Sequence, residues 1–282
     1  MFRLFFVVAF FLIIVAEQAS ASDTLFINRG NLITIKKTSI PSLAFNSTSS
    51  FAAHNSVIKI KSGFLDLVII NNDTTLHSLA LAGFGPLMKD LRPDSIGKIL
   101  RPINEGIYLY YDPVNFPSNR YLGAAGMIVV SNSNHKSFFW NIKEHQSSLN
   151  ESIVRGGIFS KRSYDPDFFT INGLSYPDIQ NDTTAKVWGS IGDTVRIYLA
   201  NTGESMHAIH FHGFHSKCLY STSQNIRAGW VKDSWAIKSM QAVVLELVID
   251  KIGRYSVHDH NLVAVSAAKT HPNGMFMIME MK

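Results

Sequence analysis

The sequence predicts an all-β protein built from two repeated domains, and three observations indicate it. Short segments rich in β-branched and aromatic residues recur along the chain, each bounded by glycine, asparagine, serine or proline. No segment of helix length carries a regular apolar stripe. The two halves of the chain also resemble each other. Many short strands separated by turn signals are typical of a β-sandwich or a barrel.

The N-terminal segment is predicted to be a secretory signal peptide. A basic start at Arg3 precedes an apolar run over residues 4–16, and residues 19–21 form a small-x-small cleavage pattern. The run is shorter than the roughly 20 apolar residues of a membrane span, so an uncleaved anchor is the less favoured alternative. We therefore predict a signal peptide over residues 1–21, cleavage after Ala21, and a secreted or periplasmic protein without a membrane span.

The first domain is expected over residues 22–132, a linker over 133–160, and the second domain over 161–282. The linker is polar at its start, and Phe138, Phe139 and Trp140 are expected to pack it against the domains. The predicted strands of the first domain are 25–28, 32–36, 57–60 and 65–70. Those of the second domain are 186–190, 194–199, 208–214, 243–248 and 254–258.

The repeat can be aligned in four segments. Residues 63–71 parallel 192–201, 76–84 parallel 206–214, 106–113 parallel 253–260, and 126–130 parallel 274–278. Both copies keep glycines and apolar positions, which indicates a duplicated β-domain. Only the second copy keeps a set of histidines.

Charge and cysteine content exclude other classes of protein. The formal net charge is +5, and no run of basic residues is interleaved with aromatic residues, so the sequence does not imply nucleic-acid binding. The single cysteine, Cys218, excludes an intrachain disulfide. It is better interpreted as a plain thiol than as a metal ligand.

Two histidine motifs indicate a metal site. His207, His210 and His212 lie in one short segment, and His258-Asp259-His260 follows later. Successive side chains of a strand face opposite sides, so His210 pairs with His212, and His258 with His260. If the two strands are neighbours, these four imidazoles converge on one face. Such a site, without a thiolate, suits Cu(II) or Zn(II).

A second site is predicted behind the same strands. Asp259 points away from its neighbouring histidines and toward whatever lies behind the strand. The candidates for this position are His207, His271 and Met275. Met275 is otherwise a core residue, and His271 is otherwise a solvated loop residue beside Pro272.

The remaining histidines are expected to be structural or exposed. His77 has no histidine partner in its own half, so it is interpreted as a core or domain-interface residue. His54, His135 and His145 stand alone in polar stretches and are interpreted as surface residues.

These motifs resemble those of the multicopper oxidase and copper nitrite reductase superfamily, whose members contain tandem cupredoxin domains. His207-Ala-Ile-His210-Phe-His212-Gly resembles the His-Pro-x-His-x-His-Gly motif of the last oxidase domain. His258-Asp259-His260 resembles its His-Cys-His motif, and His271 with Met275 resembles the trailing ligands. The resemblance implies two tandem cupredoxin-like Greek-key β-sandwich domains and a copper cofactor.

Carried over by position, His210 would be a type 2 copper ligand. His212, His258 and His260 would be type 3 ligands, while His207, His271 and Met275 would surround a type 1 copper. The sequence departs from the family at the type 1 cysteine, where it has Asp259. A blue copper centre therefore cannot form there. The first domain has Ala80, Ala82, Tyr111 and Pro113 at the matching trinuclear positions and Asp112 at the matching cysteine position, so it supplies no expected ligand.

Three hypotheses remain open. The protein is an exported copper oxidoreductase with a copper site confined to the second domain, which acts on a small-molecule substrate or an O₂ species with an external electron donor. Alternatively, it is a copper-binding or copper-buffering protein without turnover, or a partner-binding cupredoxin module. The family resemblance also suggests a homotrimer.

Overall fold

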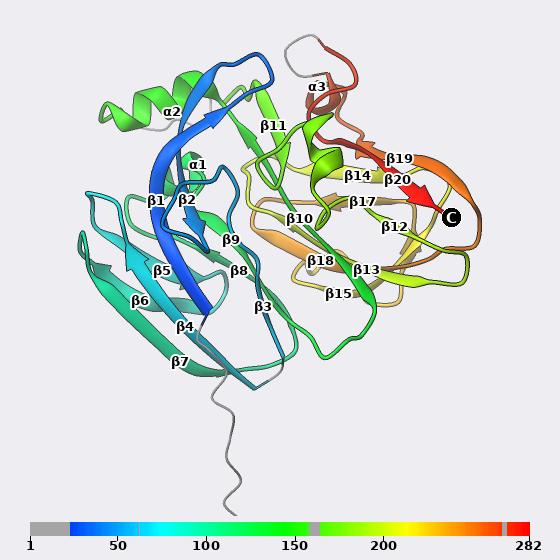
Figure 1. Cartoon of the computed structure of the whole chain (residues 1–282), viewed down its shortest axis with the longest axis horizontal. Coiled ribbons are helices and arrows are strands. Elements are labelled where there is room, and N and C mark those ends of the chain that lie inside the picture. Colours follow the sequence, from blue (N-terminus) through cyan, green and yellow to red (C-terminus); the bar gives the residue numbers. More distant parts are fainter. Residues whose placement is uncertain (1–22, 62, 158–163, 267–269) are drawn as a thin grey trace, which may run out of the picture.

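The computed structural model describes residues 23–61, 63–157, 164–266 and 270–282. The expected signal peptide, the end of the expected linker and the expected start of the second domain lie outside the described residues. The chain forms two β-sandwiches that lie side by side, with the N-terminal half on the left of Figure 1 and the C-terminal half on the right. The prediction of two cupredoxin-type sandwiches is confirmed.

The first sandwich packs a four-stranded sheet, in the order β2-β1-β4-β7, against a five-stranded sheet, in the order β3-β9-β8-β5-β6. Its elements are β1 (Asp23–Ile33), β2 (Ser39–Asn46), β3 (Ile58–Ile60), β4 (Gly63–Asn71), β5 (His77–Leu81), β6 (Gly85–Leu91), β7 (Ile96–Ile103), β8 (Gly106–Tyr111), α1 (Ser118–Leu122) and β9 (Ala125–Val130). The strand expected at 25–28 lies within one long strand, β1, whereas the strand expected at 32–36 shares only residues 32 and 33 with it.

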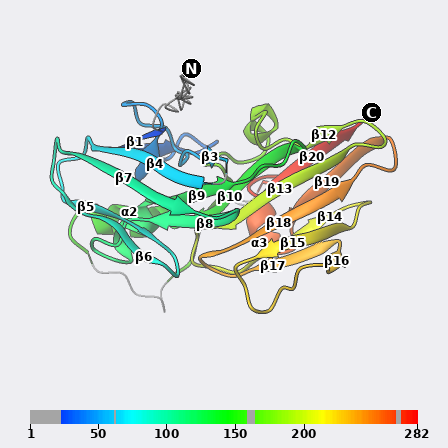
Figure 2. The ribbon, with the colours of Figure 1, turned by 90° about the horizontal axis from the view of Figure 1, so that it is seen from below.

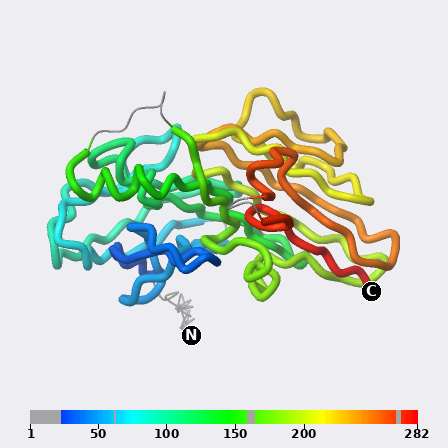
Figure 3. Tube along the Cα trace, turned by 90° about the horizontal axis from the view of Figure 1, so that it is seen from above, coloured from blue at the N-terminus to red at the C-terminus, as the bar shows by residue number. Residues whose placement is uncertain are grey.

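The second sandwich packs a six-stranded sheet, in the order β11-β10-β13-β18-β15-β16, against a five-stranded sheet, in the order β12-β20-β19-β14-β17. Its elements are β10 (Lys136–His145), α2 (Ser147–Val154), β11 (Phe168–Ile171), η2 (Asp178–Asn181), β12 (Trp188–Gly189), β13 (Thr194–Asn201), β14 (His207–Phe211), β15 (Ser216–Ser221), β16 (Val231–Lys232), β17 (Ser234–Ile237), β18 (Gln241–Val248), β19 (Gly253–Asp259), α3 (Leu262–Val265) and β20 (Phe276–Met281). Figures 2 and 3 show the two sandwiches from below and from above.

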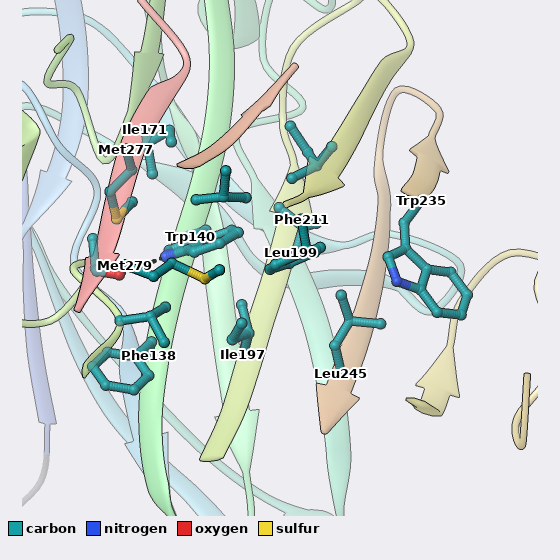
Figure 4. Close-up of a cluster of buried hydrophobic side chains, with 14 of the residues drawn as sticks. Phe138, Trp140, Ile171, Ile197, Leu199, Phe211, Trp235, Leu245, Met277 and Met279 are labelled. Atoms are coloured by element: carbon teal, nitrogen blue, oxygen red, sulfur yellow. Dashed lines mark hydrogen bonds between the residues drawn. The ribbon is translucent and has the colours of Figure 1, made fainter. Parts of the chain in front are cut away.

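The segment expected as a linker contributes a strand to the second sandwich. β10 pairs in parallel with β13, as β1 pairs in parallel with β4 in the first sandwich. The repeat therefore begins one strand earlier than the sequence suggested. Trp140 on β10 is fully buried, and its indole N–H donates to the carbonyl of Ala185. Figure 4 shows this side chain among the apolar residues of the second core.

The two sandwiches share an apolar interface. Side chains from β8 and β9 meet side chains from β10, β13 and β18 in one buried cluster. The cluster includes Ile107, Leu109, Met127, Val129, Phe139, Tyr198, Ala200, Ala242 and Val244. This layer fixes how the second domain, which carries the histidine motifs, lies against the first.

One segment of the sequence alignment is wrong by three residues. Gly126 pairs with Tyr110 across β8 and β9, and the equivalent position on β19, Val257, pairs with Met277. Gly126 therefore corresponds to Met277 and not to Gly274. The additional residues between β19 and β20, which include α3, shift β20 along the sequence relative to β9.

Among the described residues, no helix is long and apolar enough to cross a membrane.

Candidate metal centre

Four histidines converge on one face of β14 and β19, two within these strands and two just beyond their last residues. These strands are antiparallel neighbours, and His210 lies opposite His258. The ring centroid of His210 is 4.6 Å from those of His212 and His260 and 5.8 Å from that of His258. The structure therefore brings the four rings together, as the alternation of side chains along the strands predicted.

The spacing of these rings suits one shared metal ion. Imidazoles that surround an ion at a metal–nitrogen distance of about 2 Å have ring centroids roughly 5 Å apart. The centroids of His212 and His258 are 5.0 Å apart, and their Nε2 atoms are 2.9 Å apart. As the side chains stand, no three His, Cys, Asp or Glu residues of the described chain are arranged to hold an ion. The rings would have to turn about their side-chain bonds to converge on one ion.

Hydrogen bonds already orient two of the four rings. His258 Nδ1 lies 2.8 Å from the carbonyl oxygen of Asp259. Because a carbonyl only accepts, Nδ1 carries the proton and the Nε2 lone pair is left for the cluster. His210 Nδ1 lies 2.8 Å from the hydroxyl of Ser234, which holds the second ring. Burial and the charges of the neighbouring histidines lower the pKa of His210 and of His212, which favours the neutral form that binds metals.

His207, also predicted as a ligand, lies between two carboxylates in the interior. Its Nδ1 is 2.5 Å from Oδ2 of Asp259, and its Nε2 is 2.9 Å from Oε2 of Glu144. All three side chains are fully buried. Burial alone would lower the pKa of His207, but the hydrogen bonds to Asp259 and Glu144 raise it to about 9. His207 is therefore an imidazolium that donates from both nitrogens.

The first domain contains the same arrangement. His77 Nδ1 lies 2.6 Å from Oδ2 of Asp112, and His77 Nε2 lies 2.8 Å from Oδ2 of Asp73. Asp112 occupies the position equivalent to Asp259, and each of these two carboxylates also accepts two backbone N–H groups. The interpretation of His77 as a core residue is confirmed, since its side chain is fully buried. We call Glu144–His207–Asp259 and Asp73–His77–Asp112 the two buried triads.

The third member of each triad comes from a different part of the chain. Asp73 lies in the short loop before His77, and Gly203 occupies the equivalent position before His207 in the second domain. Glu144 reaches the same place from β10. A Cβ atom on Gly203 would lie 1.9 Å from Glu144 Oε2, so the absence of a side chain at 203 makes room for this carboxylate. Glu144 Oε1 also accepts the N–H groups of Glu204 and Ser205, each at 2.7 Å.

The other candidates for the second site lie apart from one another. Met275 is fully buried in the core, and its carbonyl accepts the N–H of Asp259 at 3.1 Å. His271 is exposed, and its Nδ1 lies 3.2 Å from the carbonyl of Val265. His207 has no free lone pair, because both its nitrogens serve Asp259 and Glu144. A metal bound to either nitrogen would have to displace the proton on that nitrogen and the hydrogen bond that this proton makes.

The triad of the second domain adjoins a polar contact between the domains. Arg120 on α1 is almost fully buried and donates to the carbonyl of Gly203 at 2.8 Å. It also forms an ion pair with Glu204. Lys143, next to Glu144, donates to the carbonyl of Arg120 at 2.9 Å, and burial lowers its pKa to about 7.

The sequence does not reveal Glu144 as a partner of His207, and the prediction of His145 at the surface is wrong because His145 is only 4% exposed. Both lie in the segment expected as a linker, where polar residues are expected to face solvent. The signal was present in the repeat, since Asp73 aligns with Gly203 and the second domain therefore lacks an acid. The interpretation of Cys218 as a plain thiol agrees with its position as a buried free cysteine.

Comparisons with known proteins agree with this geometry. A blue copper oxidase from Nitrosomonas europaea has the same fold, with a TM-score of 0.77 and 20% identity over 92% of this chain and 85% of that chain. The multicopper oxidase mgLAC gives 0.76 and 17%, again over 92% and 85%. A copper nitrite reductase from N. europaea gives 0.70 and 16%, over 92% and 93%. No curated protein sequence matches the chain.

Residues 157–279 match the multicopper oxidase family model. This segment is a multicopper oxidase domain. It contains the four converging histidines and two members of the second triad, His207 and Asp259, so the predicted resemblance is confirmed. The match implies a copper-binding protein of the oxidoreductase type. The equivalent face of the first domain pairs Ala80 with Tyr111, where the multicopper oxidase domain pairs His210 with His258.

The triads predict a stability maximum at mildly acidic pH. The pKa of His207 is raised to about 9 in the folded protein, so its contribution is complete below its unfolded value of 6.5 and is lost as the pH rises through about 9. The pKa values of Glu144 and Asp73 are lowered, so their contribution is lost as the pH falls below about 4.5. We expect the contribution of the triads to the free energy of unfolding to be largest near pH 5–6.5. Buried Lys143 and His145, whose pKa values are lowered to about 7 and about 3, contribute in the opposite direction as the pH falls. Denaturant titrations of the wild type and of triad variants across the pH range would separate these contributions.

Replacing the two histidines separates the two triads. His207→Gln should reduce the loss of stability between pH 6.5 and 9, a loss on the order of 3 kcal/mol. His77→Gln should reduce the corresponding loss from the first domain, because the pKa of His77 is also raised. His54→Gln, at an exposed position, is the matched control. If the unfolding free energy of His207→Gln changes between pH 6.5 and 9 as that of the wild type does, the assignment of an imidazolium at His207 is contradicted. The same result for His77→Gln would contradict the one at His77.

Proposed function

We propose that this protein is an exported copper oxidoreductase whose copper site lies in the second domain alone. His210, His212, His258 and His260 are the ligands of this site, and no blue copper centre forms. The observation that supports this assignment is the convergence of four imidazoles within the multicopper oxidase domain. The equivalent positions of the first domain carry no metal-binding side chain.

The residues around the cluster suit an open metal site. His212 and His260 are exposed, so a small-molecule substrate or an O₂ species can approach from solvent. Copper bound here supplies a redox centre. The hydrogen bond from His258 to the Asp259 carbonyl and the contact between His210 and Ser234 orient the ligand nitrogens. Asp259 stands where an electron-transferring cysteine would be, so electrons come from an external donor.

A copper-binding or copper-buffering protein without turnover is the alternative. The exposure of the ligands and the carboxylate at position 259 favour it, because both are compatible with reversible binding. A partner-binding module that does not use metal is the third candidate. Turnover of the copper-loaded protein, given an electron donor and O₂ or nitrite, would favour the oxidoreductase over the copper-buffering protein. A protein that binds no copper after reconstitution would favour the partner-binding module.

Copper binding should depend on the four histidines. We expect His210→Ala and His258→Ala to weaken copper binding by more than the roughly 10–100-fold that the loss of an outer partner costs, because each change removes a direct ligand. Copper per chain would be counted by elemental analysis after reconstitution, and EPR would report the nitrogen ligands. The wild-type protein should show no intense blue thiolate absorption.

Two control variants accompany this measurement. His54→Ala removes an exposed imidazole of the first domain and should leave the copper content unchanged. His271→Ala tests the predicted second site, and equal losses of copper in His271→Ala and His210→Ala would count against a site confined to the four histidines.

Export is the second part of the proposal. The basic start, the apolar run and the small-x-small pattern before Ser22 support cleavage after Ala21. We expect the protein recovered from the secreted or periplasmic fraction to begin at Ser22, as intact mass would determine. An N-terminus at Met1 in that fraction would refute cleavage and favour the anchor.

A homotrimer is the proposed assembly, and the repeat offers a physical argument for it. Phe64, Ile96 and Leu100 are exposed on the outer face of β4 and β7. The equivalent strands, β13 and β18, are covered by the first domain in the same chain. A neighbouring chain can cover β4 and β7 in the same way. We expect light scattering to give three times the monomer mass, and Leu100→Asp to lower it. A monomeric wild-type protein would contradict this assembly.

A further inference from the structure

A cleft of about 270 Å³ lies between the two domains, on a different sheet from the histidine cluster. The first domain contributes Glu105 and Val130, and the second contributes Arg196 and Tyr198 from β13 together with Leu219 from β15. The histidines belong to β14 and β19 of the other sheet. All residues that line the cleft lie in the described part of the chain. Its volume suits a small metabolite better than a drug-sized molecule.

The walls of the cleft are apolar. Tyr198 and Val244 belong to the buried cluster between the domains, and Leu219 packs against it. The cleft is thus an opening at the edge of this apolar layer, with the exposed side chain of Tyr220 also lining it. A ligand with an apolar body would continue the layer and remove its open edge from water.

Arg196 brings a cation to this apolar cleft. Its Nε is buried and has no hydrogen-bond partner in the structure. Its cross-strand neighbour is Glu246, but no ion pair within 4 Å joins Arg196 to an acid among the described residues. Buried N–H donors are nearly always paired, and a guanidinium matches a carboxylate in a bidentate manner. The missing partner is therefore best supplied by a ligand carboxylate.

Glu105 brings a carboxylate from the first domain. Its side chain is exposed and contacts the Ser131 hydroxyl at 3.5 Å. A ligand carboxylate on Arg196 would share the cleft with this second negative charge. An amine beside the ligand carboxylate would offset the repulsion and donate to Glu105.

We propose that this cleft binds a small α-amino acid with an apolar side chain. The ligand carboxylate pairs with Arg196, its ammonium group faces Glu105, and its side chain lies against Tyr198, Leu219 and Val244. The site is formed by both domains, so its occupation strengthens their contact. It requires no copper and is independent of the proposed redox function.

The test uses the full-length exported protein and three probes in isothermal titration. L-phenylalanine carries both charged groups, 3-phenylpropionate only the carboxylate, and phenethylamine only the amine. We expect phenylalanine to bind most tightly, phenylpropionate several-fold more weakly, and phenethylamine not measurably. Arg196→Met should weaken phenylalanine binding at least tenfold, as expected for the loss of a charged hydrogen-bonded pair. Arg196→Lys should restore part of the affinity, because it keeps the charge but loses the bidentate geometry.

Two further variants keep the proposal falsifiable. Lys217→Met removes a cation beside Glu246 on the same sheet, outside the cleft, and should leave the affinity unchanged. Glu105→Gln, at an exposed position, should weaken the binding of phenylalanine but not of phenylpropionate, whether or not Arg196→Met folds. The proposal is overturned if neither carboxylate binds, or if a folded Arg196→Met variant binds both as the wild type does. Equal affinity for phenylalanine and phenylpropionate would overturn the role of Glu105.

Discussion

The buried hydrogen bonds of His207 to Asp259 and Glu144 connect the strands that carry the histidine cluster with the opposite sheet of the second sandwich. They join β14 to β19 in one sheet and to β10 in the other. Removing one partner of a buried ion pair typically costs about 3–5 kcal/mol, because the remaining charge is left unpaired in a medium of low polarity. The two strands that carry the four converging histidines are therefore held in register by charges as well as by the backbone ladder.

The same interaction reaches the contact between the domains. Glu144 accepts the N–H groups of residues 204 and 205. The carbonyl of Gly203 in the same loop accepts from Arg120 of the first domain. Lys143, next to Glu144, donates to the carbonyl of Arg120. Contacts therefore lead from the domain interface through Glu144 and His207 to Asp259, which lies between His258 and His260 in the sequence. The path consists of direct contacts throughout. Gly203 is necessary to it, because any side chain there would displace the Glu144 carboxylate.

The presence of a second triad in the first domain separates the scaffold from the metal site. Asp73–His77–Asp112 is built in the same way, yet Ala80, Ala82, Tyr111 and Pro113 stand where the other domain has its histidines. A buried triad can therefore form without histidines on the opposite face of its strands. The four histidines of the second domain are an addition to a scaffold that is complete without them, which agrees with a site-specific role for these residues.

Sequence reasoning succeeded where the chemistry depends on local periodicity. Alternation along a strand sufficed to place His210, His212, His258 and His260 on one face and to turn Asp259 the other way. It failed where the partner comes from a distant strand. Glu144 and His145 are polar residues in a polar segment, and they are buried at the end of β10 that pairs with β11. No local pattern distinguishes a buried, compensated charge from a solvated one.

The exchange of a thiolate for a carboxylate at position 259 changes the charge balance of the interior. The triad of the second domain contains two carboxylates and one imidazolium, and Lys143 beside Glu144 supplies a further cation. The two carboxylates are thus stabilised by the imidazolium of His207 and by four backbone N–H groups, and below about pH 7 also by the charge of Lys143. Copper on the opposite face can then bind and leave without exposing an unpaired buried charge. Asp259 already accepts His207 Nδ1–H and two backbone N–H groups, so its carboxylate has little capacity left for a metal and contributes to the structure of the interior instead.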